Sequence, residues 1–297
     1  MDNSSSRRQL LKHLVVGSLA VATNPMGVLA ANDSNKMSSK LKGNVNHAVC
    51  RWTYSFLSLE ELCVVANKIG LKAIDLIGPK EWNVLKDYGL DSSMCNGAEI
   101  SLTEGWNHKE YHATLIKNYT DHINYVADAG YKNLICFSGN RKGMDEETGM
   151  KNCVDGLKQI MALAEKKGVT IQMEVFNSKV NHPDYMADNT KWTIELCKQL
   201  GSPNFKILYD IYHMQISEGD IIATIKKNHE YFGHYHTAGV PGRHEIDESQ
   251  ELYYPAIIKA VVDTGFKGYL AQEFIPTAKE NADKIKALKL AVKICDV

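Results

Sequence analysis

The sequence predicts a single-domain α/β protein of the (β/α)8-barrel class, and three observations carry this prediction. From about residue 45, short apolar runs alternate with longer helical stretches, as βα units of a parallel sheet require. Glycines follow five of the helical stretches, where a left-handed terminal residue is favoured. The 297 residues also accommodate eight units of about 30 residues, which is typical of a barrel.

Seven apolar runs have the length and composition of buried strands, and the region 89–96 can supply an eighth. The runs are 45–50, 73–77, 133–137, 170–175, 206–209, 231–236 and 268–274. Helices are expected over 58–69, 111–129, 146–167, 190–200, 254–264 and 278–294. Ser58 and Glu61 have the spacing of a capping box at the start of the first helix. The first strand is not followed by Gly-x-Gly-x-x-Gly, which disfavours a dinucleotide-binding sheet.

The N-terminal segment has the order of an export signal and not of a folded element. Ser6-Arg7-Arg8 precedes a short apolar run over 14–22, and small residues follow near 30–31. Paired arginines at this place indicate the twin-arginine route. We therefore expect a signal peptide over 1–31, a linker over 32–43 and the barrel over 44–297, with a periplasmic location. The apolar run is too short for a membrane anchor, which needs about 20 residues.

Composition and cysteine spacing argue against nucleic acid as a partner and against a cysteine metal site. The net charge is -1, and 23% of the residues are charged without a long basic stripe, so nucleic acid is not expected to bind. Seven cysteines are scattered without paired metal-ligand spacing. Those at 50, 63, 136 and 197 lie inside apolar patterns, so we expect buried small side chains there.

Polar residues end four successive strands in the C-terminal half. Glu174, Asp210, His236 and Glu273 each terminate an apolar run, at separations close to one βα unit. They should therefore fall on the fifth to eighth strands and converge at the C-terminal mouth, where barrel active sites form. For any one of them a salt bridge or a helix cap is an equal alternative. Four such residues at the ends of successive strands favour a shared site.

Three carboxylates and one imidazole form a predominantly hard donor set. Burying them without a partner is unfavourable, so a divalent cation is expected, with Mg²⁺ or Mn²⁺ preferred. Glu174 and Glu273, three strands apart, are predicted to face each other and act as an acid–base pair. One would remove a proton beside a carbonyl and the other return it at the next carbon, through an enediolate stabilised by the metal.

Four motifs resemble hydroxypyruvate isomerases of the xylose-isomerase-like barrel superfamily. They are Met173-Glu-Val-Phe-Asn-Ser-Lys179, Tyr209-Asp-Ile-Tyr-His-Met-Gln215, Gly233-His-Tyr-His-Thr-Ala-Gly-Val-Pro-Gly-Arg243 and Gly268-Tyr-Leu-Ala-Gln-Glu273. The resemblance implies conversion of hydroxypyruvate to tartronate semialdehyde. It also implies that Glu174 and Glu273 are catalytic, with Asp210 and His236 completing the metal site.

Further residues are candidates for binding substrate. The resemblance favours His213 as a donor to a substrate oxygen, the alternative being a helix-start histidine bonded to backbone. Arg243 can grip a carboxylate with two hydrogen bonds, or lie solvated in a loop. For His182 a role in a turn is favoured. Whether Glu99, Trp52 and Trp106 line the pocket is left open by the sequence.

Two other functions remain open at this point. A ketose 3-epimerase or another sugar isomerase would use the same four ligands. In the epimerases a further carboxylate is expected six residues after the first glutamate, where this chain has Val180. An exported sugar- or metal-binding protein without turnover is the other alternative. A nuclease of the related barrel is disfavoured by the missing histidines and basic face. The expected partner is a small molecule, and pairing into a homodimer is compatible with the sequence.

Overall fold

The structure, a computed structural model, describes residues 40–297. The predicted signal peptide over 1–31 and residues 32–39 of the predicted linker lie outside the described residues. Within the described part, the backbone N–H of Lys42 donates to Asp296 and the amide of Asn44 donates to the carbonyl of Val297. The start of the described chain is therefore hydrogen-bonded to its C-terminus.

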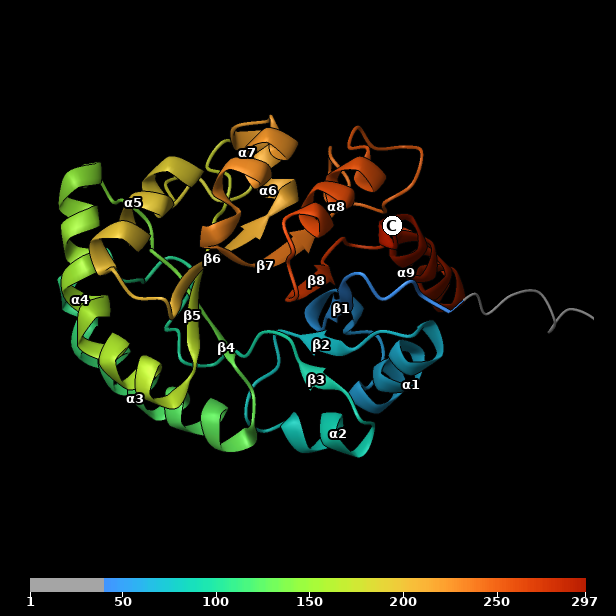
Figure 1. Cartoon of the computed structure of the whole chain (residues 1–297), viewed down its shortest axis with the longest axis horizontal. Helices are drawn as coiled ribbons and strands as arrows, with labels where there is room; N and C mark the ends of the chain where they lie inside the picture. Colours follow the sequence, from blue (N-terminus) through green and yellow to red (C-terminus); the bar gives the residue numbers. More distant parts are fainter. Residues whose placement is uncertain (1–39) are drawn as a thin grey trace, which may run out of the picture. The chain divides into compact units, whose positions relative to one another are not determined.

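Eight parallel strands form one sheet at the centre of the molecule (Figure 1). Their order is β3-β2-β1-β8-β7-β6-β5-β4, so consecutive strands pair from β1 to β3 and from β4 to β8, and β1 pairs with β8. The strands are β1 (Asn46–Cys50), β2 (Ala73–Asp75), β3 (Asp91–Ser92), β4 (Asn133–Cys136), β5 (Thr170–Glu174), β6 (Phe205–Asp210), β7 (Phe232–Thr237) and β8 (Tyr269–Gln272). This confirms the predicted TIM-barrel-like α/β fold with eight parallel strands.

The connection between β3 and β4 is the irregular part of the ring. β3 is two residues long, so the predicted strand over 89–96 is mostly loop. Cys95 closes the gap as a single bridging residue. Its N–H donates to Asn133, and its carbonyl accepts from Ile135 of β4. The backbone groups at this edge are thereby paired by a loop, in place of a full strand.

Helices follow the strands and cover the outside of the sheet (Figure 1). The main ones are α1 (Leu59–Ile69), α3 (His112–Ala129), α4 (Glu146–Lys167), α5 (Thr190–Leu200), α8 (Tyr254–Asp263) and α9 (Asn281–Cys295). All six were predicted, with ends within three residues. The capping box is present: Ser58 accepts from the N–H of Glu61, whose side chain accepts from the N–H of Ser58.

Three short helices were not predicted: α2 (Trp82–Asp87), α6 (Ile211–Ser217) and α7 (Ile221–Asn228). Each is eight residues or fewer, too short for a clear apolar period. One local signal was available at α6. Asp210 is its N-cap and accepts from the N–H of His213, which satisfies an unpaired donor of the first turn.

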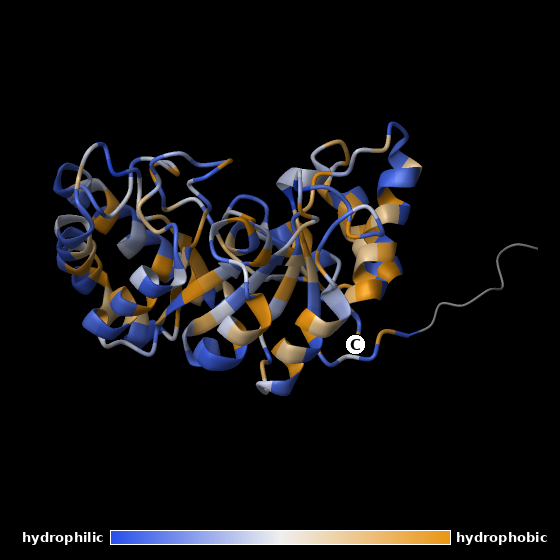
Figure 2. Ribbon diagram, turned by 90° about the horizontal axis from the view of Figure 1, so that it is seen from above, coloured by the Kyte–Doolittle hydropathy of each residue, from blue (hydrophilic) through white to orange (hydrophobic). Residues whose placement is uncertain are grey.

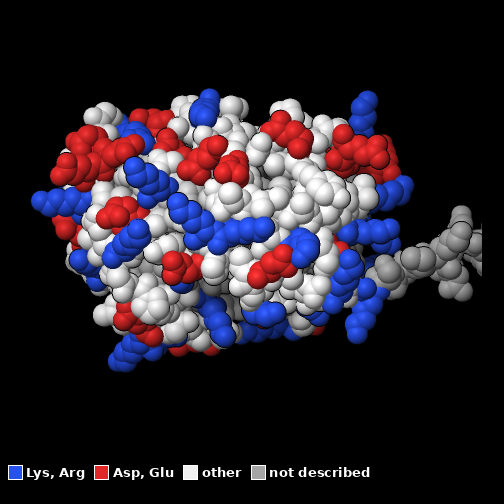
Figure 3. All heavy atoms as spheres, turned by 45° about the horizontal axis from the view of Figure 1, so that its top comes forward, with Lys and Arg blue, Asp and Glu red and all other residues white. Residues whose placement is uncertain are grey.

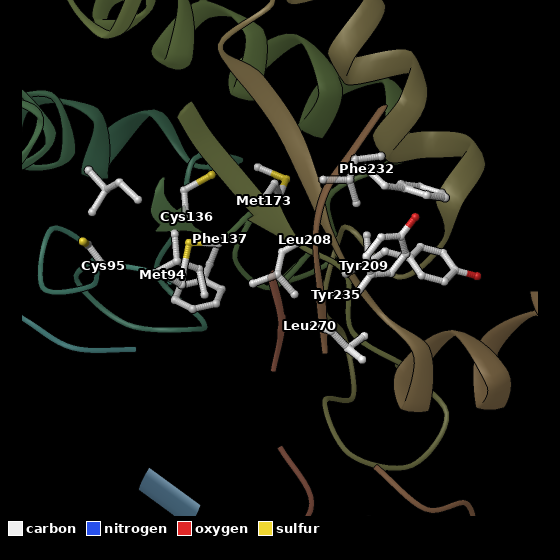
Figure 4. Packing of buried hydrophobic residues seen from close by; sticks show 14 of the residues in the cluster. Met94, Cys95, Cys136, Phe137, Met173, Leu208, Tyr209, Phe232, Tyr235 and Leu270 are labelled. Carbon is white, nitrogen blue, oxygen red and sulfur yellow. The ribbon is translucent and has the colours of Figure 1, made fainter. Parts of the chain in front are cut away.

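The main core lies between the strands and the helices. Apolar residues concentrate on the strands and the inner helix faces (Figure 2), and Met173, Leu208 and Leu270 are part of one extended cluster (Figure 4). A separate small cluster holds the residues Ala48, Cys50, Ala73 and Ala271. Because these alanines alternate with outward-facing apolar residues on neighbouring strands, the small cluster marks the barrel interior.

The outer surface of residues 40–297 carries mixed charge. On the face in Figure 3, acidic and basic side chains are interspersed without a field of one sign. No helix in the described chain is both long and apolar enough to cross a membrane. All seven cysteines are buried and free, which confirms the expectation for those at 50, 63, 136 and 197.

Candidate metal centre

Side chains from four successive strands converge at the C-terminal mouth of the barrel. Glu174 and Asp210 are the last residues of β5 and β6, His236 is next to last in β7, and Glu273 follows β8. One ligand atom from each lies within 4.8 Å of the others, and all four side chains are buried. The predicted register is thus present, and the four residues form one cluster.

His236 is the centre of this cluster. Its Nδ1 lies 3.0 Å from Oε1 of Glu174 and 2.9 Å from Oε2 of Glu273. Its Nε2 lies 3.0 Å from Oδ1 of Asp75, at the end of β2. Glu174 and Glu273 therefore meet at one ring nitrogen of His236.

Asp210 serves the cluster and its own helix at once. One oxygen caps α6 at the N–H of His213. The other, Oδ2, lies 3.7 Å from Nη2 of Arg243, and the carboxylate offers one of the converging ligand atoms. The capping role considered from the sequence is therefore present together with membership of the cluster.

Burial and mutual repulsion perturb the carboxyl groups strongly. Burial, with the charge of Glu273, raises the pKa of Glu174 to about 8. Burial raises the pKa of Asp210 to about 7, although Arg243 opposes the shift. For Glu273, burial is outweighed by Arg243 and His236, which hold its pKa well below the usual range. The surrounding carboxylates likewise overcome burial and raise the pKa of His236 well above its usual value.

The residues present fit a divalent cation. Three carboxylates and one imidazole are buried within 4.8 Å of each other. Two of the three carboxyl groups have raised pKa values, so repulsion and desolvation oppose their joint ionisation. A cation there would relieve that repulsion. Mostly oxygen donors with one nitrogen favour Mg²⁺ or Mn²⁺ over a closed zinc site.

Arg243 borders the cluster from the loop after β7. Its Nη2 lies 2.5 Å from Oε2 of Glu273, and its guanidinium stacks over Trp52 and Tyr212, 5.2 and 5.6 Å from the ring centroids. Trp52 itself donates from Nε1 to Oε1 of Glu273 at 2.9 Å. Arg243 thus contacts two aromatic rings while its charge faces the carboxylates.

A cavity of about 610 Å³ opens onto the cluster. Glu174 and Glu273 form part of its lining, and Arg243, His182 and Trp52 stand beside them. The rest of the lining comes from the end of β2, the loop after β3, and β4 with the start of its following loop. It includes the apolar residues Leu76, Ile100, Leu102, Ile135 and Phe137. Its volume lies within the range of ligand sites, roughly 300–1,000 Å³.

The remaining sequence candidates divide into two groups. Glu99 and Trp52 line the cavity, whereas Trp106 is fully buried elsewhere. His182 lines the cavity and stacks on Phe176 at 4.1 Å, although only a role in a turn was favoured from the sequence. Burial, with Arg243 nearby, lowers the pKa of His182 to about 4.

His213 is fully buried beside the cluster and is not among the residues lining the cavity. Asn177 uses its side-chain oxygen to accept from the N–H groups of Val180 and Asn181. Its amide nitrogen therefore faces Nδ1 of His213, 2.6 Å away, and donates to it. The neutral ring then carries its proton on Nε2, which has no hydrogen-bond partner among the described residues.

Sequence reasoning missed Asp75 and His234. Both are fully buried, and Nε2 of His234 lies 2.9 Å from Oδ2 of Asp75. The rule that found the other four residues applies to Asp75 as well, since it ends the apolar run of β2. His234 precedes His236 by two residues and so shares its face of β7.

Comparisons with known proteins agree with the fold and with the family resemblance. A 2-oxo-tetronate isomerase of Cupriavidus necator is 35% identical over 119 residues, 40% of this chain and 45% of that protein. The hydroxypyruvate isomerase of Escherichia coli is 27% identical over 161 residues, 54% and 62% of the two chains. The chain thus spans about half the length of these curated relatives.

Solved structures share the fold at low identity. An AP endonuclease, family 2, from Brucella melitensis matches with a TM-score of 0.71 and 21% identity, covering 82% of this chain and 96% of that one. D-psicose 3-epimerase from Clostridium cellulolyticum matches with a TM-score of 0.70 and 16% identity, covering 84% and 98%. A family model, the xylose isomerase-like TIM barrel, matches residues 66–291. With eight parallel strands and most of its length matched by that model, the chain belongs to the xylose isomerase-like TIM barrel family.

Proposed function

We propose that the protein is an isomerase that moves a proton between neighbouring carbons of a small hydroxy-carbonyl compound, with hydroxypyruvate converted to tartronate semialdehyde. The observation that carries the proposal is the pair of buried glutamates, Glu174 and Glu273, which meet at His236 on the wall of a cavity. A site that only binds a ligand has no need of two buried proton acceptors beside each other. The names of the relatives, hydroxypyruvate and 2-oxo-tetronate isomerase, support the same reaction class.

The chemistry assigns a separate task to each group. One glutamate takes the proton from C3 of hydroxypyruvate, the other delivers a proton to C2, and the proton on the C3 oxygen passes to the C2 oxygen. Glu174, Asp210, His236 and Glu273 would hold a divalent cation, which supplies a Lewis acid for the two substrate oxygens when bound. Trp52 fixes one oxygen of Glu273 by a hydrogen bond, which limits rotation of that carboxylate.

Arg243 is the group we assign to the substrate carboxylate. It lines the cavity, and its guanidinium lies over the rings of Trp52 and Tyr212. The planar guanidinium can donate two parallel hydrogen bonds to a carboxylate. Glu273 lies beside it, so a bound acid would have its reacting carbons next to the proposed acid–base pair.

The experiment that tests this function is proton exchange in deuterated water. Purified protein with Mn²⁺ or Mg²⁺ is given hydroxypyruvate and a panel of ketoses, and deuterium incorporation is followed by mass spectrometry. Glu174→Gln and Glu273→Gln should each lower exchange by at least about a hundredfold, the lower range for general acid–base catalysis. Glu99→Gln is the matched control, because Glu99 lines the same cavity outside the cluster.

The outcomes separate the candidate functions. Exchange on hydroxypyruvate that is lost in both cluster variants and kept in the control supports the isomerase. Exchange confined to ketoses supports a ketose 3-epimerase or a related sugar isomerase in place of a hydroxypyruvate isomerase. Exchange on none of these compounds, with Mn²⁺ bound, contradicts the proposal and supports a binding protein without turnover.

The second candidate is a ketose 3-epimerase or related sugar isomerase. Two observations favour it: the structural likeness to D-psicose 3-epimerase, and a cavity of about 610 Å³, which is large for a three-carbon acid. Against it, position 180, where a further carboxylate is expected, holds Val180, whose side chain is 64% exposed. The ketose panel decides between these candidates.

We also propose that the protein is exported through the twin-arginine route, with cleavage near residue 31. The support is the order of Arg7, Arg8, the apolar run and the small residues in the sequence. Replacing both arginines by lysine should retain the protein in the cytoplasm of a bacterial host. Intact-mass measurement of periplasmic protein would show removal of the first 31 residues or so. Unchanged export of the lysine variant would contradict this route.

A further inference from the structure

A second buried polar group lies directly beneath the candidate metal centre. Asp75 on β2 and His234 on β7 are both fully buried, and neither lines the cavity. In the sheet order β2-β1-β8-β7, these two strands are not neighbours. Their side chains can therefore meet only through the barrel interior. Interior layers of such barrels are usually filled by branched apolar residues. A carboxylate with two imidazoles is unusual at this place and indicates a specific role.

The carboxylate of Asp75 is held at both of its oxygens. Oδ1 lies 3.0 Å from Nε2 of His236 and 3.5 Å from Sγ of Cys50. Oδ2 lies 2.9 Å from Nε2 of His234 and 2.5 Å from the hydroxyl of Ser93. Three hydrogen-bond donors, on β1, on β7 and in the loop after β3, thus fix the place and the plane of one carboxylate, and the imidazole of His234 lies against its second oxygen. This is more support than a buried charge receives from a single ion pair.

The contact to His236 has a direct consequence for the metal centre. Oδ1 of Asp75 accepts the Nε2 proton of His236, which leaves Nδ1 directed at Glu174 and Glu273. A ligating imidazole whose other nitrogen donates to a carboxylate has its tautomer and ring orientation fixed.

We propose that Asp75 is the positioning residue of the metal centre: it fixes the ring and tautomer of His236, and His234 holds Asp75 in place. Asp75 acts through His236 and does not touch the substrate cavity. The inference rests on the proposed function, because it assigns His236 to the metal. It adds a group on a strand that contributes none of the four predicted ligands.

The test is the affinity of the purified protein for Mn²⁺, measured by calorimetry. Asp75→Asn has nearly the same shape, but its amide cannot hold two imidazoles by charge. Loss of an outer-shell carboxylate of this kind lowers metal affinity by about 10–100-fold, and that loss is expected here. Ser93→Ala is the matched control. It removes another donor to Asp75 without touching His236, and should keep affinity near that of the wild type.

His234→Gln provides a second variant should Asp75→Asn fail to fold. It leaves Asp75 facing His236 but removes the imidazole that holds Oδ2, so a smaller loss of Mn²⁺ affinity is expected. Wild-type affinity in both variants, or in the only one that folds, would overturn the proposal. Thermal melting without metal establishes folding of each variant independently of the affinity.

A spectroscopic readout separates this inference from the metal site itself. In protein labelled with ¹⁵N-histidine, the Nε2 proton of His236 should be visible and slow to exchange, and it should be lost in Asp75→Asn. The measurement works in metal-free protein. If the wild type binds no divalent cation, the proposed metal centre fails, whereas the proton signal still decides whether Asp75 holds His236. An Nε2 proton unchanged in Asp75→Asn contradicts the positioning role.

Discussion

At the scale of single residues, His236 is where the charges of the site converge. Carboxylates contact both of its ring nitrogens, and burial removes the water that would otherwise screen them. The metal-free site therefore shares protons among its members. Glu174 has its pKa raised to about 8. In spite of burial, Arg243 and His236 lower the pKa of Glu273, and the imidazoles of His234 and His236 lower that of Asp75.

These shifts predict how the stability of metal-free protein depends on pH. The folded pKa values of Glu174, about 8, and Asp210, about 7, lie above those of the unfolded chain, near 4. The folded state therefore binds more protons, and this stabilisation disappears as pH rises through the folded pKa values. The raised pKa of His236 makes the free energy of unfolding fall with rising pH as well. Histidines with lowered pKa values, such as His182, change the free energy of unfolding in the opposite direction, but only below about pH 6.5.

We therefore expect the free energy of unfolding, measured by urea titration with chelator, to fall between about pH 6.5 and 8. The slope should approach 1 kcal/mol per pH unit for each proton lost, an order-of-magnitude value. Glu174→Gln removes one titrating group and should flatten the curve, whereas Glu99→Gln should leave it as in the wild type. Stability that stays level or rises across this window would contradict the assigned shifts.

Arg243 is predicted to determine how tightly a substrate carboxylate binds. Arg243→Lys keeps the charge near Glu273 but loses the planar pair of donors and the stacking on Trp52. KM for hydroxypyruvate should rise about tenfold or more, corresponding to one charge-assisted hydrogen bond of roughly 1.5–3 kcal/mol. Steady-state kinetics with a hydroxyketone that lacks a carboxylate provides the comparison. Equal losses for both substrates would show that Arg243 acts on the site and not on the carboxylate.

At the scale of elements, the βα unit determines which side chains reach the mouth. Each strand that supplies the cluster ends at or beside its site residue, and the following loop or helix begins at once. Asp210 is the clearest case, because it ends β6 and caps α6. The helices on the outside instead depend on their own local signals, which are independent of the cluster.

The first helix provides a test of that independence. Ser58→Ala removes the side-chain acceptor of the N–H of Glu61 and breaks the capping box of α1. The free energy of unfolding should fall by about 1 kcal/mol, while kcat and Mn²⁺ affinity remain as in the wild type. Urea titration and calorimetry measure the two effects. Glu60→Gln is the control, since Glu60 lies in the same turn without a capping bond. Loss of Mn²⁺ affinity in Ser58→Ala would show that α1 and the cluster are coupled.

At the scale of the whole molecule, the site connects strands from both halves of the chain. Glu174, Asp210, His236 and Glu273 come from β5 to β8, and Asp75 brings in β2. A cation held by the four ligands would bind only the folded barrel, because the unfolded chain does not bring these strand ends together. Metal binding and folding are therefore linked.

That linkage predicts stabilisation by Mn²⁺ of about 2.7 kcal/mol at a concentration one hundred times the dissociation constant. Thermal and urea unfolding with and without chelator measure it. Glu273→Gln should reduce the stabilisation strongly, and Glu99→Gln should retain it. A full effect of Mn²⁺ in Glu273→Gln would place the metal outside the cluster.

Much of the fold was predictable because each βα unit carries local information. Apolar runs predicted seven strands, and glycines such as Gly70 and Gly168, with φ of +96° and +67°, end their helices as expected. The eighth strand was predicted too long. Backbone pairing with β4 is made there by Cys95, a tertiary contact that no local pattern encodes. The helices α2, α6 and α7 escaped because they are too short to show a period.

The order of the elements, and the place of Glu174, Asp210, His236 and Glu273 at successive strand ends, could be predicted from the chain alone. This was possible because strand length and burial depend on the pattern of neighbouring residues. The contacts of the two glutamates with one nitrogen of His236, and of Asp75 with the other, became known from the folded barrel. Those contacts join residues far apart in the chain across a closed interior, where distance and desolvation set the charge of each group, and neither quantity exists until the barrel has formed.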